Sequence, residues 1–229
     1  MPSAADIMAI ARREAFAPVE ILDVDVWADR YRVIDAKGRR WRTETTPYMR
    51  RIMRCFTHPM IRHITAMCGS QVAKTEGLFI NCLCYAIDCD PQHAIAMFPV
   101  PEDGSEFREE RLMPSIRATP ELYRHLRPSP RDEKELKIRF DRMTLNLVGS
   151  NTKRERRSRP ANFIFLDEVS AYSDPGYVEI YDRVKASDGT HKIVDCSSPT
   201  DEDVGIDVPF KQGSQESFYC PCPHCGHYQ

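Results

Sequence analysis

A buried strand that ends in two carboxylates constrains this chain more than any other stretch of its sequence. Residues 163–166 read Phe-Ile-Phe-Leu, and Asp167 and Glu168 follow them directly. A short run of apolar β-formers is typical of a strand that is buried on both faces of a parallel sheet. Burying an unpaired charge costs free energy, so a cation or a polarised water is expected at the end of this strand. In open α/β sheets, ligands bind at this edge, beyond the carboxyl ends of the strands.

This strand end matches a Walker B element, in which the aspartate supports Mg²⁺ and the glutamate activates water. Such a site also needs a phosphate loop of the form G-x4-G-K-[ST], whose backbone N–H groups surround phosphate oxygens at a helix start. Lys74 and Thr75 stand at the required place, between a predicted strand and a predicted helix. Cys68 and Ala73 occupy the two glycine positions, and Gly69 comes one residue late. The loop is therefore irregular, and on its own it is equally compatible with a capped, exposed helix end.

The spacing of the two motifs favours a shared site. Enough chain separates Lys74 from Asp167 for two intervening strands with their crossovers. Both residues would then lie at the C-terminal edge of one sheet, as a nucleoside triphosphate site requires. The segment Ser197-Ser198-Pro199-Thr200 follows the next predicted strand, where its hydroxyls could sense the terminal phosphate, although alone it is an ordinary turn sequence.

The composition narrows the class of protein. Hydrophobic residues make up 41% of the chain and charged residues 29%, as in an ordinary globular protein. The net charge of −2 does not by itself indicate nucleic-acid binding, so any such contact must come from a local patch. There is no apolar run of the ~18–20 residues that span a bilayer, and charged residues interrupt the N-terminal stretch where a signal peptide would be apolar. A cytoplasmic protein without membrane contact is expected, and its nine cysteines indicate reduced thiols or a metal site.

Predicted strands and helices alternate along the chain, which indicates a mostly parallel α/β sheet. Helices are expected over residues 3–17, 26–31 and 75–87, from Thr46-Pro47 as N-cap and first residue, through Phe107 and Leu112, from Thr119-Pro120, and over 177–186. Strands are expected over residues 62–68, 94–98, 163–168 and 191–196, with a hairpin of 136–140 and 143–148 and a short strand from Ser217.

Several short segments also fall in a characteristic order. They are Trp27-Ala28-Asp29-Arg30-Tyr31, Trp41-Arg42-Thr43, Thr46-Pro47-Tyr48, Ser70-Gln71-Val72-Ala73-Lys74-Thr75-Glu76, Asp88-Cys89-Asp90-Pro91, Leu147-Val148-Gly149-Ser150-Asn151, Leu166-Asp167-Glu168-Val169, Ser197-Ser198-Pro199-Thr200 and Cys222-Pro223-His224-Cys225-Gly226. On these segments the chain from about Trp27 to Gln229 resembles the ATPase part of a large terminase subunit, the DNA-packaging motor protein of tailed bacteriophages, in its lambda-like branch. The resemblance implies a P-loop NTPase fold of the ASCE, RecA-like type, a three-layer α/β sandwich with a mostly parallel central sheet.

The resemblance also implies roles for single residues. Lys74 and Glu168 would be catalytic, with Glu168 orienting or deprotonating the attacking water, and Thr75 and Asp167 would hold Mg²⁺. The residues that bind ATP and its phosphates would be Gly69, Ser70, Gln71, Val72, Ala73, Lys74 and Thr75, with Tyr48 near the adenine. Residues expected to couple hydrolysis to movement on DNA are Ser197, Ser198 and Thr200. An arginine finger is expected among Arg108, Arg111, Arg117 and Arg183.

Ala73 marks a departure from the family, which commonly has glycine at this position. If the position needs a positive φ, alanine is strained there and phosphate affinity falls.

The expected domain organisation has three parts. Residues 1–45 form an N-terminal helical arm, residues 46–213 the P-loop ATPase domain, and residues 214–229 the start of a cysteine-rich segment. Family members carry a nuclease domain after the ATPase, and the sequence is interpreted as a fragment that stops before one could begin. Endonuclease activity is therefore not expected of these residues.

The implied function is Mg²⁺-dependent ATP hydrolysis that moves double-stranded DNA into a procapsid in the host cytoplasm. Expected partners are the small terminase subunit, the portal of the procapsid and further copies of the chain in a ring, with a monomer in isolation. One alternative is a helicase-like DNA translocase with the same nucleotide core. The other is a degraded nucleotide fold that serves as a DNA-binding or assembly module, and Cys68 and Ala73 are its best support.

Two further features carry weaker signals. Cys220, Cys222 and Cys225 are candidate zinc ligands, because C-x-x-C before glycine is half of a zinc knuckle, but a structural site needs four ligands. A reduced, frayed tail is the alternative. The basic run over residues 153–159 supplies candidate DNA contacts in Lys153, Arg154, Arg156 and Arg157, although most such runs are solvated loops.

Overall fold

The computed structural model describes residues 21–127, 133–134, 136–151, 161–173, 175–184 and 189–228. Within these ranges, a seven-stranded sheet with the order β1-β7-β6-β2-β5-β4-β3 forms the centre of the molecule. Its strands are β1 (His63–Met67), β2 (Ala94–Phe98), β3 (Glu133–Lys134), β4 (Lys137–Arg139), β5 (Thr144–Gly149), β6 (Phe163–Asp167) and β7 (Lys192–Ser197). The pairs from β1 to β5 in this order are parallel, and β4 and β3 add two antiparallel pairs. The prediction of a mostly parallel α/β sheet is confirmed.

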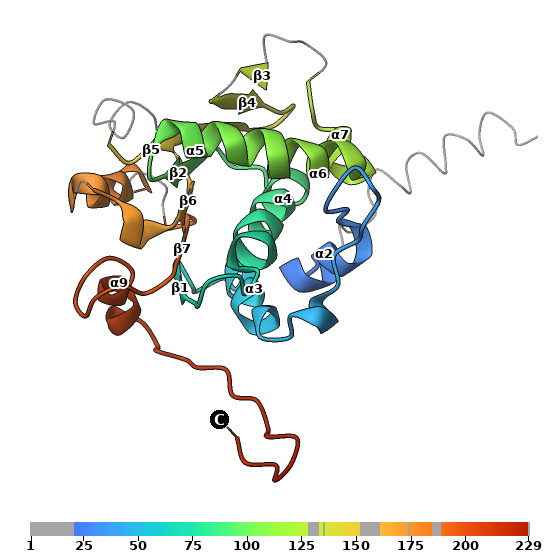
Figure 1. Cartoon of the computed structure of the whole chain (residues 1–229). Helices are drawn as coiled ribbons and strands as arrows, with labels where there is room; N and C mark the ends of the chain where they lie inside the picture. Colours follow the sequence, from blue (N-terminus) through green and yellow to red (C-terminus); the bar gives the residue numbers. More distant parts are fainter. Residues whose placement is uncertain are drawn as a thin grey trace, which may run out of the picture.

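Helices cover the sheet and lie in the order that the alternating pattern predicts. They are α2 (Val24–Tyr31), η1 (Thr43–Thr45), α3 (Met49–Thr57), η2 (Lys74–Ile80), α4 (Asn81–Asp88), α5 (Pro101–Glu106), η3 (Phe107–Leu112), α6 (Met113–Ala118), α7 (Pro120–Tyr123), η4 (Val169–Ala171), η5 (Pro175–Val184) and α9 (Asp207–Gln212). In the view of Figure 1, the run from α5 to α6 crosses one end of α4, while the C-terminal segment after α9 extends away from the body. None of the helices in the described ranges is long and apolar enough to cross a membrane.

Two hydrophobic clusters, one on each face of the sheet, give the molecule three layers. Phe163 and Phe165 of β6 join the larger cluster, which includes residues of α2, α3 and α4. Ile164 and Leu166 join the smaller cluster, which includes Ile180 of η5. Successive side chains of a strand point to opposite faces, so a strand between two helical layers must be apolar throughout. All five residues of β6 are buried, as its sequence predicts.

The helical run from α5 through η3 to α6 contains a π-helical turn at η3. Pro114 has no N–H group, and its ring disturbs the regular i→i−4 pattern in the preceding turn. The Met113 N–H instead bonds the carbonyl of Arg108, five residues back. Widened turns of this kind are frequent at functional sites. Here the turn carries Arg111, which faces the candidate site described below.

Local expectations fail where no strong pattern supports them. Thr46 is not an N-cap, because Thr46–Tyr48 form a turn in which the Met49 N–H bonds the Thr46 carbonyl, and α3 begins at Met49. The expected strand from Ser217 is absent from the described chain, and α9 was not expected. The helix expected over residues 3–17 and the basic run over 153–159 lie outside the described residues. Trp27 of α2 and Trp41 belong to the larger core cluster, so this part of the N-terminal arm packs onto the sheet domain.

Candidate functional site

The ends of three neighbouring strands define the candidate site. β7 lies between β1 and β6, so the loop after β1 and the carboxylates after β6 face each other across the end of β7. Cys68 extends the ladder, since its N–H bonds the Ser197 carbonyl at 3.0 Å. Asp167 pairs in register with Cys196. The sheet edge therefore brings together the predicted phosphate loop, the predicted Walker B pair and the serine cluster.

The loop residues Gly69, Ser70, Gln71, Val72 and Ala73 connect β1 to η2, and Lys74 is the first residue of η2. Lys74 is only 6% exposed. Its Nζ lies 2.9 Å from Glu168 Oε1 and donates to Ser198 Oγ at 3.1 Å. A capped, exposed helix end does not account for a lysine that is buried between two other motifs of the same site.

Thr75 and Asp167 meet on the inner side of the loop. The Thr75 hydroxyl donates to Asp167 Oδ2 at 3.0 Å and lies 3.3 Å from Oδ1. Burial raises the pKa of Asp167, and the charge of Glu168 adds to this, while hydrogen bonds from Cys196 and Thr75 oppose it. A buried carboxylate whose charged form is disfavoured is stabilised by a nearby cation.

The Thr75–Asp167 pair fits the requirements of Mg²⁺. Mg²⁺ prefers oxygen ligands and is usually bound through one or two carboxylates together with phosphates and water. In the described part of the chain, no three His, Cys, Asp or Glu side chains group closely enough to hold a metal ion without such help. The residues present therefore suit an ion that arrives with a nucleotide.

Glu168 has a different environment from its neighbour Asp167. Its backbone is left-handed, at φ 53° and ψ 47°, and its N–H bonds Asp167 Oδ1 at 3.1 Å. This turn directs the two adjacent side chains apart, and the Glu168 side chain is 44% exposed whereas Asp167 is buried. Ser197 Oγ lies 3.5 Å from Glu168 Oε2 and accepts the Ser170 N–H at 3.1 Å. The two carboxylates can therefore serve separate roles.

Ala73 adopts the left-handed conformation, at φ 58° and ψ 25°. The position where the family commonly has glycine thus needs a positive φ in this chain. A residue with a Cβ atom is strained there by about 1–2 kcal/mol. Gln71 also has a positive φ of 58°.

Arg32 holds the start of η2, the helix that follows the loop, through hydrogen bonds and an ion pair. No sequence pattern had indicated this role for Arg32. Its buried guanidinium donates to the Glu76 carbonyl at 2.6 Å and forms an ion pair with Glu76 Oε2 at 2.5 Å. It also donates to Asn81 Oδ1 at 2.5 Å. Arg32 therefore ties the segment after α2 to η2 and α4, and only the fold shows that this arginine lies there.

An open pocket of about 600 Å³ adjoins these residues. It is lined by Ile34, Asp35, Arg39, Gln71, Ala73, Lys74, Thr75, Glu76, Glu110, Arg111 and Glu168. Of the four arginine-finger candidates, Arg111 lines this pocket. The Tyr48 hydroxyl donates to the Val72 carbonyl at 3.2 Å, so Tyr48 lies against the loop. Thr200 is exposed beyond the end of β7.

The remaining candidate residues fall elsewhere. Lys153, Arg154, Arg156 and Arg157 lie outside the described residues. All nine cysteines are free thiols. Backbone N–H groups of Cys225 and His224 bond the Cys222 sulfur and lower the pKa of its thiol. Cys220 does not join Cys222 and Cys225 in a metal-binding group among the described residues.

Comparisons with known proteins agree with this geometry. A sequence model of the family "Phage terminase large subunit gpA, ATPase domain" matches residues 35–229. The terminase large subunit of Enterobacteria phage P21 is 21% identical over 245 residues, and the match covers 99% of this chain and 37% of that protein. This chain therefore spans little more than a third of that curated relative.

Solved structures show the same fold. The crystal structure of the HK97 bacteriophage large terminase has a TM-score of 0.63 at 13% identity, with 83% of this chain and 41% of that chain covered. The ATPase domain of the Thermus phage P74-26 large terminase has a TM-score of 0.50 at 15% identity, with 73% and 71% covered. With a family model that matches most of its length, the chain belongs to the ATPase-domain family of phage terminase large subunits.

Proposed function

We propose that this chain is the motor domain of a viral large terminase that hydrolyses ATP with Mg²⁺ to move double-stranded DNA into a procapsid. One observation carries the proposal. Lys74, Thr75, Asp167 and Glu168 come from two distant motifs, yet they meet at one sheet edge through contacts of about 3 Å. Phosphoryl transfer depends mainly on positioning and charge neutralisation, and this set supplies both.

Each of these residues has a distinct proposed role. Lys74 exchanges its contact with Glu168 for the terminal phosphates of ATP. Thr75 and Asp167 hold the metal ion, which neutralises charge on the phosphates. Glu168, released from Lys74 and already half exposed, positions the attacking water or takes its proton. Arg111 lines the same pocket and is the best-placed candidate for an arginine that stabilises the transition state.

The serine cluster is proposed to link nucleotide state to motion. Ser198 contacts Lys74, and Ser197 contacts both Glu168 and the backbone of Ser170. Movement of Lys74 or Glu168 when the phosphates bind or leave would thus move Ser197 and Ser198 at the end of β7. That movement would continue into the segment that leads to Thr200 and α9. Tyr48, held against the loop by its hydroxyl, is proposed to lie beside the adenine.

The proposed setting follows the family. The ATPase domain spans residues 46–213, with the described part of the preceding segment, from residue 21, packed on it, and acts in the host cytoplasm. Double-stranded DNA, the small terminase subunit, the portal and further copies in a ring are the proposed partners. The cysteine-rich segment 214–229 would supply Cys222 and Cys225 as two ligands of a zinc site.

Two substitutions test the proposal. Glu168→Gln should retain ATP binding, measured by calorimetry, and reduce phosphate release by about a hundredfold or more, as loss of a general base does. Lys74→Ala should weaken ATP binding itself. Glu44→Gln, which changes an exposed glutamate of η1, is the matched control. Equal turnover in Glu168→Gln and the parent would remove Glu168 from the mechanism.

The strained Ala73 favours a degraded nucleotide fold as a second candidate function, a DNA-binding or assembly module. No ATP-dependent thermal shift and no phosphate release, with DNA binding retained, would decide for that module. Strand separation without any capsid component would decide for a helicase-like translocase.

A further inference from the structure

A second pocket, of about 350 Å³, lies at the opposite edge of the sheet from the nucleotide site. It is lined by His93, Arg127, Lys137, Arg139, Phe140, Asp141, Arg142, Met143 and Thr144. His93 precedes β2 and Thr144 begins β5, whereas Asp167 is the last residue of β6 and Lys74 follows the loop after β1. At about 3.3 Å per residue, the six residues of β5 place roughly 20 Å between the two edges. An anion in this pocket would therefore not be the phosphates of the bound nucleotide.

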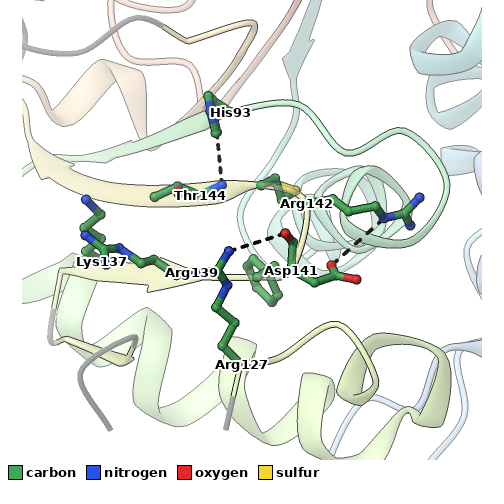
Figure 2. A pocket seen from close by; sticks show the side chains of 9 residues that line it. His93, Arg127, Lys137, Arg139, Asp141, Arg142 and Thr144 are labelled. Atoms are coloured by element: carbon green, nitrogen blue, oxygen red, sulfur yellow. Dashed lines mark hydrogen bonds and ion pairs between the residues drawn. The ribbon is translucent and has the colours of Figure 1, made fainter. Parts of the chain in front are cut away.

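Strand geometry concentrates positive charge in this pocket. Lys137 and Arg139 lie two residues apart on β4, so they share a face while Ile138 between them is fully buried. Arg127 and Arg142 come from the segments before and after β4; in Figure 2, Arg127 points toward Asp141, whereas the Arg142 side chain extends away from Lys137 and Arg139. Among the residues that the structure describes, Asp141 is the one acidic residue that lines the pocket.

Asp141 offsets this charge only in part, because its carboxylate is shared between His125 and Arg142. Both of its carboxylate oxygens lie 3.1 Å from Nδ1 of His125, which is not among the lining residues. Arg127 bonds the Asp141 carbonyl at 3.5 Å, and Arg142 bonds the Asp88 carbonyl at 2.9 Å. Nε of Arg142 also lies 4.0 Å from Asp141 Oδ1, in an ion pair. A guanidinium has five N–H donors, so each arginine keeps donors beyond these contacts. The lining therefore combines four basic side chains, all of which already make contacts with other groups.

The surface of the pocket suits phosphate oxygens better than a protein partner. Its two apolar members, Phe140 and Met143, are 1% and 2% exposed. Protein interfaces are usually anchored by buried apolar or aromatic side chains, and this pocket offers none at its surface. Arginine and lysine side chains from three segments line the pocket, and such groups match the oxygens of a phosphate backbone.

We propose that this basic pocket binds the phosphate backbone of duplex DNA without sequence preference. The choice of DNA as the source of the phosphates rests on the proposed motor function, while the anion site rests on the pocket alone. A duplex held here would lie at the edge of the domain opposite the nucleotide, so the sheet itself would connect the two ligands.

Substitution of the outer face of β4 tests this proposal. Lys137→Gln/Arg139→Gln removes two charges, and Arg50→Gln/Arg51→Gln removes two from exposed positions of α3 as the matched control. The probe is a fluorescent mixed-sequence duplex of about 30 base pairs, titrated by anisotropy between about 50 and 200 mM salt. The β4 variant should bind at least about tenfold more weakly at 0.1 M salt, with a salt slope lower by about 1–2. The control should stay within about twofold of the parent, and thermal melts should show both variants folded.

Three outcomes would overturn the proposal. The first is unchanged duplex affinity and salt slope in a folded β4 variant. The second is no duplex binding by the parent at the lowest salt. The third is loss of self-association with DNA affinity unchanged, which would assign the pocket to an acidic segment of a second copy. Phosphate release is measured in parallel, so a parent without turnover contradicts the motor function and leaves the DNA result to be judged separately.

Discussion

Replacing Ala73 with glycine should stabilise the chain, because Ala73 holds a left-handed backbone at φ 58° and ψ 25°. A residue with a Cβ atom is strained there by about 1–2 kcal/mol, and glycine is not. Glycine in turn costs about 0.4–1 kcal/mol, because it raises the conformational entropy of the unfolded chain. The difference is about 1 kcal/mol in favour of Ala73→Gly. For a chain of this length, that corresponds to a rise in Tm of about 2–4 °C.

Thermal and urea denaturation followed by circular dichroism measure this change. Ala118→Gly is the matched control, since it removes the same methyl group from the last residue of α6. Glycine in the middle of a helix costs about 0.5–1 kcal/mol relative to alanine, so at the last residue of α6 this control should lower Tm by less than that full cost would. The two substitutions are chemically identical and should move stability in opposite directions.

The effect on nucleotide binding has an upper limit. If the free loop already holds the conformation that binds phosphate, Ala73→Gly leaves the ATP affinity unchanged. If the free loop relaxes away from it, affinity rises by at most the relieved strain, about fivefold for 1 kcal/mol. A Tm for Ala73→Gly below that of the parent would refute the strain, as would a gain in affinity far above this limit.

Three further substitutions have expected outcomes. Asp167→Asn should abolish Mg²⁺-dependent hydrolysis and raise stability at neutral pH. Because burial raises the pKa of Asp167, the parent should lose stability as pH rises from the ordinary carboxyl pKa through the raised one. Thermal melts across about pH 4–7 should show this loss only in the parent. Gly149→Ala should destabilise the fold by about 1–3 kcal/mol in urea, since the new Cβ would lie 2.5 Å from Cδ of Pro101. Arg32→Lys should cost about 3 kcal/mol in the same assay, because an ammonium cannot replace the forked contacts with Glu76; stability equal to the parent would show that these contacts are dispensable.

The elements that were predictable from sequence are those with a strong local pattern. The strand over residues 94–98 has the predicted limits, and β6 begins at Phe163 as predicted and ends at Asp167, one residue before the expected limit. Full burial on both faces demands uninterrupted apolar residues, and few other structures produce that pattern. Helix α9 and the start of α3 carry no such pattern: no residue of α9 is buried, and Tyr48 before α3 makes no side-chain cap. Their limits depend on contacts with distant segments.

The sequence by itself determined which chemical groups form the candidate site. A carboxylate pair at the end of an apolar strand and a Lys-Thr pair at a helix start are local patterns, and each has few physical explanations. The order of the strands could not be read from the sequence, because pairing between parallel strands depends on crossovers packed against both faces of the sheet. Only the tertiary structure placed β7 between β1 and β6, which brings Ser197 and Ser198 to the two motifs. The burial of Arg32 against η2 and α4 is also a tertiary result, since Arg32 and its partner Asn81 are far apart in the chain. The left-handed Ala73 and the basic pocket on β4 were likewise seen only in the structure.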